Sequence, residues 1–242
     1  MREITMNKVY ACSDLHGQYK LWEQISNYCD KTDKIYFLGD ALDRGPDGVK
    51  IMQELLSDPR VIYLKGNHED MLVKNMTLYL YDIEIPEKEF LEWSYNGGAP
   101  TFQKFTSCPI EIQKSYIANL NRLPTFQIYK NKKNQTIFLC HAGFHPDEVV
   151  DVLWNRNHLI KTRWNGDNND FIVHGHTPVQ HLKKILYVSD QKYKEFKDMD
   201  PQVIFYCENH KIDIDLASFH TNKTALLDLD TFEPIYFSFA QE

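Results

Sequence analysis

The segment at residues 39–45 (Gly-Asp-Ala-Leu-Asp-Arg-Gly) constrains the fold of this chain most strongly. It follows the apolar run 35–38, which predicts a buried β-strand. A strand that ends in Gly-Asp places a carboxylate at the edge of a sheet, where open α/β sheets bind their ligands. Asp40, Asp43 and Arg44 therefore lie where a site is expected. A plain strand, loop and helix start, with Gly45-Pro46 as the turn, would also explain the segment taken alone.

The same arrangement recurs along the chain. Apolar runs at 9–12 and 61–64 predict two more strands, and apolar residues at helical spacing in 21–29 and 49–56 separate the three. This alternating order is typical of right-handed βαβ units and predicts an N-terminal βαβαβ core. Two later runs, at 136–140 and 171–173, also end in polar residues. The candidate ligands that follow these strands are Asp14, His16, Asp40, Asn67, His141 and His176.

The remaining residues complete an α/β fold, expected to be a two-sheet β-sandwich flanked by helices. Residues 71–123 are predicted mostly helical, with 96–100 as a loop that either lines the site or only connects helices. Residues 125–140 predict a β-hairpin. Residues 187–200 are charged and irregular and predict a surface loop. A second, antiparallel sheet packed on the first is the simplest place for four short strands, near 203–207, 212–216, 224–229 and 235–239.

Composition limits the classes of protein that the chain can represent. Its 242 residues suffice for one domain with a sizeable core, and since no linker divides residues 1–242, a single domain is expected. The formal net charge of −7 argues against a general nucleic-acid binder. The five scattered cysteines contain no C-x-x-C and no C-x5-R, which argues against a disulfide framework, a zinc knuckle and a thiol-based phosphatase. With no apolar signal region and no membrane-length apolar run, we expect a cytoplasmic protein, with a monomer favoured.

The candidate ligands form an inventory for two metal ions. Asp14 and His16 can hold one ion. The other ion can be held by Asn67, His141 and His176, and Asp40 can bridge the two. Hydrolytic sites of this kind hold their ions roughly 3.5–4 Å apart. Mixed nitrogen and oxygen donors suit Mn²⁺, Fe or Zn²⁺ better than Mg²⁺ or Ca²⁺.

The charge of such a site indicates its substrate. The positive charge of two divalent ions exceeds the negative charge of the two aspartates and a bridging hydroxide, so that the site keeps a net positive charge. Arg44 adds to that charge, and its guanidinium suits phosphate oxygens. A phosphomonoester dianion fits this field, whereas an uncharged ester or peptide would not need it.

Five motifs carry a resemblance to a known family. They are D-x-H-G at 14–17, G-D-x-x-D-R-G at 39–45, G-N-H-E at 66–69, H-A-G at 141–143 and G-H at 175–176. In this order they resemble the calcineurin-like metallophosphoesterase superfamily, and within it the short bacterial type of the phosphoprotein phosphatase family of serine/threonine phosphatases. The segment 93–101 also resembles the bacterial branch.

The resemblance implies a role for each matching residue. The six candidate ligands match the metal ligands, and Asn67 is also expected to bind the substrate phosphate. The mechanism implied is in-line attack by metal-bound hydroxide without a covalent intermediate. Arg44 matches a phosphate-binding arginine, His68 the general acid and Asp43 its carboxylate partner, a pairing that favours the proton-donating imidazole. Arg156 is nominated as the second phosphate arginine, with Arg163 as its rival.

Three functions remain open from the sequence. The first is a metal-dependent phosphatase that acts on a phosphorylated protein or a small phosphoester, without nucleic-acid or membrane partners. The second is hydrolysis of dinucleoside polyphosphates of the bis(5'-nucleosyl)-tetraphosphatase type, with a base pocket from Trp93, Tyr95 or Phe102. The third, a non-catalytic metal- and phosphate-binding module, would have no reason to keep His68, Asp43 and Arg44 together. A supporting position beside the ligand His176 remains open for His174, because residues two apart on an extended segment point to one side.

Overall fold

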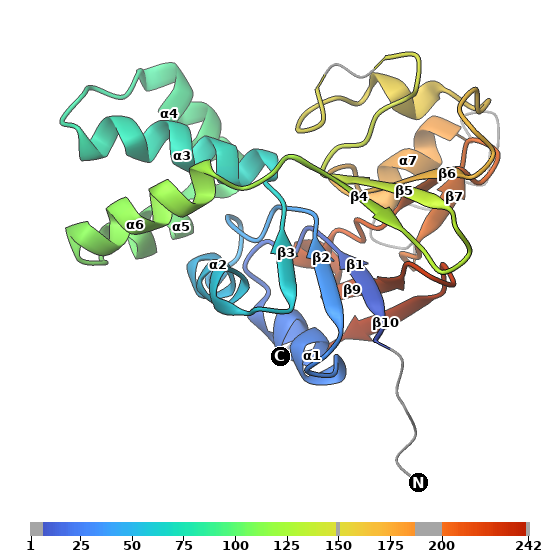
Figure 1. Cartoon of the computed structure of the whole chain (residues 1–242). Helices are drawn as coiled ribbons and strands as arrows, with labels where there is room; N and C mark the ends of the chain where they lie inside the picture. The colour runs from blue at the N-terminus through green and yellow to red at the C-terminus, as the bar shows by residue number, and fades with distance from the viewer. Residues whose placement is uncertain (1–6, 149–150, 187–199, 241–242) are drawn as a thin grey trace, which may run out of the picture.

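The computed structural model describes residues 7–148, 151–186 and 200–240, which form two packed five-stranded sheets flanked by helices (Figure 1). The first sheet has the order β10-β9-β1-β2-β3 and the second β4-β5-β6-β8-β7. The strands of the first sheet are β1 (Val9–Cys12), β2 (Lys34–Phe37), β3 (Val61–Tyr63), β9 (Lys223–Asp228) and β10 (Pro234–Ser238). Those of the second are β4 (Phe126–Lys130), β5 (Thr136–Cys140), β6 (Asp170–His174), β7 (Ile204–Tyr206) and β8 (Lys211–Asp213).

The parallel strands explain why the polar motifs meet. Strands β1, β2 and β3 run parallel to one another, as do β5, β6 and β8 in the second sheet. The carboxyl ends of parallel strands lie at one edge of a sheet. The expected two-sheet fold with a βαβαβ core is therefore confirmed.

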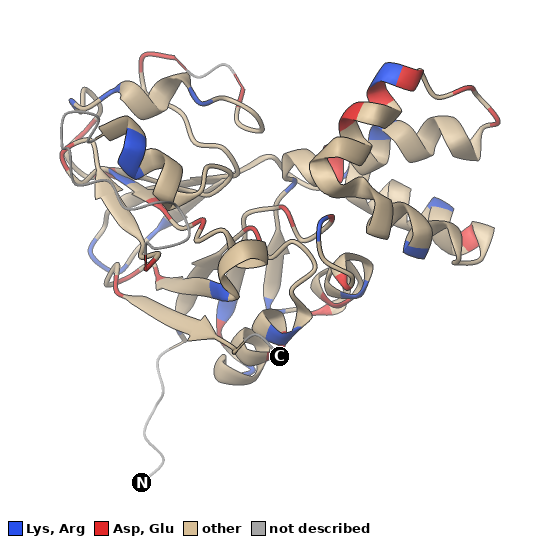
Figure 2. Ribbon diagram, turned by 180° about the vertical axis from the view of Figure 1, so that it is seen from behind, with Lys and Arg blue, Asp and Glu red and all other residues tan. Residues whose placement is uncertain are grey.

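Helices cover the outer faces of the sheets and extend beyond them. The helices α1 (Tyr19–Tyr28) and α2 (Gly48–Ser57) lie against the first sheet, and α7 (Val179–Leu186) lies beside the second (Figure 1). A helical projection extends to one side, made of α3 (Asn67–Leu80), α4 (Glu87–Trp93), η1 (Ser94–Gly98), α5 (Ala99–Thr106) and α6 (Ile110–Asn121). Acidic and basic residues are interspersed along this projection (Figure 2). Two short helices, η2 (Asn157–Ile160) and α8 (Ser218–Thr221), complete the second half.

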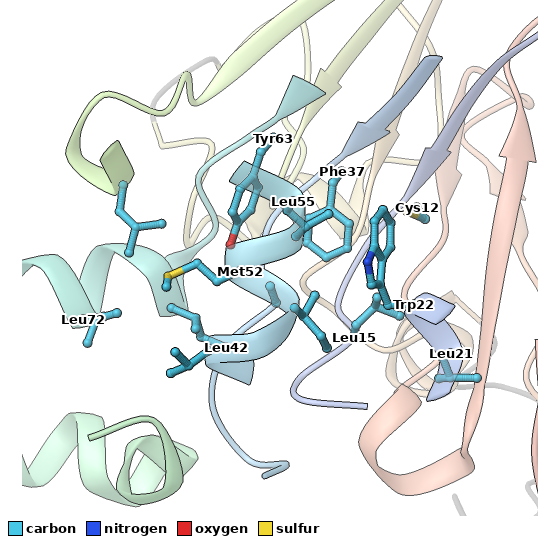
Figure 3. Packing of buried hydrophobic residues seen from close by; sticks show 14 of the residues in the cluster. Cys12, Leu15, Leu21, Trp22, Phe37, Leu42, Met52, Leu55, Tyr63 and Leu72 are labelled. Carbon is cyan, nitrogen blue, oxygen red and sulfur yellow. The ribbon is translucent and has the colours of Figure 1, made fainter. Parts of the chain in front are cut away.

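Two apolar layers hold the strands in place. Between the sheets, Ala11 and Leu38 from the side of the first sheet belong to the same buried cluster as Leu139 and Val173 from the second sheet. On the other face of the first sheet, Trp22 of α1 packs edge-on against Phe37 of β2, with 6.3 Å between ring centroids (Figure 3). These layers fix where each strand ends, and so where each polar motif begins.

The structure corrects two expectations and leaves one outside its description. Residues 96–100 are not a loop, because a π-helical turn with Gly97 at φ +98° runs directly into α5. The C-terminal strands do not form one antiparallel sheet: β9 and β10 join the first sheet, while β7 and β8 join a second sheet that also contains parallel pairs. The segment 187–199 lies outside the described residues. Among the described residues, no helix combines the length and apolar character needed to cross a bilayer.

Candidate active site

The carboxylate of Asp40, directly after β2, is the centre of the site. Its Oδ2 lies 3.4 Å from Nε2 of His141, 3.5 Å from Nε2 of His16 and 3.7 Å from Nε2 of His68. Asp14 joins this group, since its Oδ1 lies 3.9 Å from the same nitrogen of His16. All five side chains are buried. The structure thus brings together residues from both sheets that are far apart in the sequence, from Asp14 to His141.

Left-handed backbone turns, rather than extended strands, aim these side chains. Asp14, His16 and Asp40 have φ of 55°, 43° and 59°, and His176 has φ of 67°. Such angles are uncommon outside glycine and occur where surrounding structure enforces them, often at functional sites. Asp14 and His16 therefore do not lie on an extended segment, although both side chains face the site.

Backbone carbonyls hold the Nδ1 atoms of His16 and His141, so that the Nε2 atoms of both rings face Asp40. The Nδ1 of His16 donates to the carbonyl of Leu42 at 2.9 Å, and the Nδ1 of His141 donates to that of Leu38 at 2.8 Å. A hydrogen bond of this kind fixes the ring and leaves the Nε2 lone pair for a metal. Burial, with help from nearby cations, lowers the pKa of His16 well below its usual value and so favours the neutral imidazole.

The second half of the ligand set contains an unpaired buried atom. The Nε2 of His176 is buried and has no hydrogen-bond partner among the described residues. Its Nδ1 and the Nε2 of His141 each lie 2.8 Å from Oδ1 of Asn67. Candidate ligand atoms of Asp40, His141 and His176 all lie within 4.8 Å of one another. An imidazole nitrogen, a carboxylate oxygen and an amide oxygen that lie this close together fit a divalent cation.

A second cluster of candidate ligand atoms consists of His16, Asp40 and His68. His68 differs from the other two residues, because a carboxylate outside the cluster holds its Nδ1 and a cation lies beside its Nε2. Its Nδ1 donates to Oδ2 of Asp43 at 2.7 Å, and its Nε2 lies 3.2 Å from Nη2 of Arg44. This network indicates the Nδ1–H tautomer, with Nε2 facing the arginine.

A buried glutamate, Glu69, organises the loops around Asp40. Its carboxylate accepts hydrogen bonds from the backbone N–H of Asp40 and Gly66 at 2.8 Å each and from that of Ala41 at 2.9 Å, and from the hydroxyl of Tyr63 at 2.8 Å. From the sequence we expect Glu69 only as the last residue of the G-N-H-E motif, without a role of its own. A signal was present, because Glu69 is the third residue of α3, where a glutamate caps its own helix start.

The two arginines considered for phosphate lie in different places. Arg156 donates from Nε to Thr177 Oγ1 at 3.1 Å and from Nη2 to the carbonyl of His176 at 3.3 Å. With Arg44 it lines a surface cavity of about 1200 Å³. Arg163 lines a separate, smaller hollow beside His145. The arrangement therefore favours Arg156 as the second arginine at the site.

His174 does not support His176 in the way its spacing predicts. Its Nε2 pairs with the hydroxyl of Tyr206 at 2.8 Å, and its ring meets that of His158 edge-on with 5.3 Å between centroids. The left-handed turn at His176 directs the two histidines to different surroundings. His174 belongs to a buried polar cluster next to the site, not to the ligand set.

Comparison with known proteins identifies the class to which this fold and site belong. Residues 7–214 match the model of the calcineurin-like phosphoesterase family, and the chain belongs to that family. It is thus a metallophosphoesterase by family, as the motifs indicated.

Individual relatives carry two different names. Serine/threonine-protein phosphatase 1 of Salmonella typhimurium is 25% identical over 183 residues, covering 71% of this chain and 79% of that protein. The asymmetrical bis(5'-nucleosyl)-tetraphosphatase of Oceanobacillus iheyensis is 26% identical over 255 aligned positions, covering 89% of this chain and 86% of that protein. A crystal structure of a protein proposed to be a diadenosine tetraphosphatase superposes with a TM-score of 0.61 at 16% identity, covering 98% of this chain and 96% of that one, which shows a shared fold.

Proposed function

We propose that this chain is a dinuclear-metal-dependent phosphomonoester hydrolase that acts as a serine/threonine protein phosphatase. The observation that carries the proposal is one buried arrangement: the His68–Asp43 pair and Arg44 stand beside the candidate metal ligands. A module that only bound metal and phosphate would not need a proton-donating pair there. We also propose Mn²⁺ as the metal and the cytoplasm as the location.

In the proposed reaction, different residues bind the metal ions, bind the phosphate and donate the proton. Two divalent ions, held by Asp14, His16, Asp40, Asn67, His141 and His176, would stabilise charge on the phosphoryl group and make an attacking water more acidic. Arg44 and Arg156 bind the phosphoryl oxygens from the cavity side. With both ring nitrogens protonated, His68 donates the proton on Nε2 to the leaving oxygen, while Asp43 holds the Nδ1–H and keeps the ring oriented.

The shape of the surface beside the site supports a phosphorylated side chain as substrate. The cavity that contains Arg44 and Arg156 is open to solvent and extends to the ends of β9 and β10, where Lys223 and Ser238 line it. A polypeptide can lie along such a surface while one phosphorylated residue reaches the arginines. The alkoxides of serine and threonine are poor leaving groups, and a general acid contributes most when the leaving group is poor.

One observation favours a second candidate, hydrolysis of dinucleoside polyphosphates. Tyr95 is 85% exposed and lines the same cavity as Arg44. An aromatic ring beside a phosphate-binding arginine suits a nucleotide base, because bases stack on aromatic side chains. The relative from Oceanobacillus iheyensis carries this activity in its name and aligns over most of this chain.

A substrate panel on the Mn²⁺-loaded protein separates these functions. We expect hydrolysis of a phosphoserine peptide, with His68→Ala slowing it about 100-fold or more. If diadenosine tetraphosphate is hydrolysed far better than the peptide, and Tyr95→Ala raises its KM while leaving that of the peptide unchanged, the second candidate replaces the first. Turnover of neither substrate by protein with bound metal would leave only the binding module.

A further inference from the structure

The carboxylate of Asp43 is held by two donors that come from different parts of the chain. Its Oδ2 accepts a hydrogen bond from Nδ1 of His68 at 2.7 Å and another from Nε1 of Trp93 at 2.8 Å. Trp93 lies 50 residues further along, at the end of α4 in the helical projection. All three side chains are at most 1% exposed. The other carboxylate oxygen, Oδ1, has no hydrogen-bond partner among the described residues.

The backbone of the same loop is bound by the residues that follow Trp93. The N–H of Asp43 donates to Oγ1 of Thr101 at 2.9 Å, and the N–H of Arg44 donates to the carbonyl of Gly97 at 2.8 Å. A Cβ atom on Gly97 would lie 2.8 Å from Cγ of Arg44. The segment 93–101 therefore contacts Asp43 and Arg44 through side chain and backbone alike.

A second donor matters because the torsion that orients a carboxylate is soft. The terminal torsion of an aspartate has a broad, roughly two-fold distribution, so that one hydrogen bond does not fix it well. With Oδ1 unpartnered, the indole N–H of Trp93 is the second contact that keeps Oδ2 facing His68. The imidazole orientation, and with it the direction of Nε2, depends on that carboxylate.

We infer that Trp93 is a positioning residue for proton donation by His68, which rests on the function proposed above. In the reaction, water forms a new P–O bond while the bond from phosphorus to the leaving oxygen breaks. The proton on Nε2 of His68 goes to the leaving oxygen, and the proton lost by the water returns to the imidazole through solvent. Trp93 touches neither substrate nor metal and acts only by holding Asp43.

Two aryl substrates distinguish this role from a general contribution to folding. A phenolate leaves poorly without a proton, whereas 4-nitrophenolate leaves well without one. In the Mn²⁺-loaded protein we expect Trp93→Phe to lower kcat for phenyl phosphate about 10- to 100-fold, the usual range for loss of a supporting partner. The loss for 4-nitrophenyl phosphate should be several times smaller. KM for both should be unchanged, because Arg44 and Arg156 remain.

The chain offers a matched control for this substitution. Trp22 is also fully buried and donates from Nε1 to a carboxylate, Oε2 of Glu54 at 2.9 Å, outside the site. Trp22→Phe should leave the ratio of the two rates as in the wild type. A phenylalanine at position 93 keeps the edge-on packing against Phe90 and Phe102, so that the fold is expected to persist.

Each result decides the inference. Equal losses for the two aryl phosphates in Trp93→Phe, or no loss for either, would overturn it. If Trp93→Phe does not fold, Gly98→Ala replaces it: a Cβ there would lie 2.5 Å from Nε1 of Trp93 and displace the indole, with the same unequal losses expected. His68→Ala is the reference for the proposed function. If His68 is the general acid, this variant loses more rate with phenyl phosphate than with 4-nitrophenyl phosphate. Equal losses in this variant would show that the proposed function of His68 is wrong, separately from the role of Trp93.

Discussion

At the scale of single residues, Glu69 shows how one buried side chain can hold a site together. Its two oxygens accept four hydrogen bonds, and three of their donors are backbone N–H groups of the loops around Asp40. Hydrogen bonds to a charged acceptor are stronger than those between neutral groups. The position of the central carboxylate therefore depends on a residue that is expected to touch neither metal nor substrate.

The substitution Glu69→Gln tests this dependence. An amide nitrogen would face backbone N–H donors whichever way the side chain is flipped, so at least one buried donor loses its partner. We expect the free energy of unfolding of the metal-free protein to fall by about 2–4 kcal/mol, measured by urea denaturation. The control is Asp70→Asn, whose carboxylate pairs with the exposed Lys74 and should change the same quantity by less than about 1 kcal/mol. Similar values for the two variants would contradict the organising role.

At the scale of elements, a buried lysine joins the strands and the short helix of the second half. Lys211, the first residue of β8, is fully buried. Its Nζ donates to the carbonyl of His158 in η2 at 3.1 Å and lies 5.6 Å from the ring centroid of Tyr206 in β7. His158 in turn pairs with the carbonyl of Ala142 at 2.7 Å, next to the ligand His141. The elements behind the ligand loops are thus connected through one cation.

Burial lowers the pKa of Lys211 from 10.5 to about 8, and this shift predicts a pH dependence of stability. Between these values the unfolded chain binds the proton more tightly than the folded one, so that stability rises with pH across the window and is lost as pH falls through 8. Relative to Lys211→Met, the wild type should gain up to about 3 kcal/mol in free energy of unfolding between pH 8 and 10.5. A difference between the two proteins that stays constant over this range would show that Lys211 is not desolvated.

The sequence predicts where the strands lie better than it predicts which strands pair in each sheet. The strands and the ligand positions after them follow from short local patterns, such as the apolar run before Gly39, and the structure has them at the expected places. Sheet membership of β7 to β10 depends on contacts between distant segments, which local periodicity does not encode. The hydrogen bond from Trp93 to Asp43 and the left-handed turn at His176 are of the same kind, since only the folded chain brings those atoms together.

At the scale of the whole molecule, the candidate metal site lies where the strand ends of the two sheets meet. Asp14, His16 and Asp40 follow strands of the first sheet, while His141 and His176 follow strands of the second. Ions bound there would connect the two sheets of the sandwich. Binding to the folded state alone stabilises it by mass action, by about 4 kcal/mol at a thousand times the dissociation constant.

Metal binding should therefore raise the melting temperature. We expect saturating Mn²⁺ to raise Tm of the EDTA-stripped protein by roughly 10 °C, from about 2–4 °C for each kcal/mol in a chain of this size. Asp40→Asn should remove most of this increase, whereas Asp30→Asn, which changes an exposed carboxylate away from the site, should retain it. An equal increase in both variants would place the bound ions elsewhere.

The central claim is that bound metal turns this chain into a phosphoester hydrolase, and one titration tests it most directly. Mn²⁺ is added stepwise to the EDTA-stripped protein while bound metal and the rate of phosphate release from 4-nitrophenyl phosphate are measured on the same samples. We predict negligible activity without metal and a rate that reaches its maximum at two bound ions per chain. Two bound ions without phosphate release, or full activity in the stripped protein, would contradict the claim.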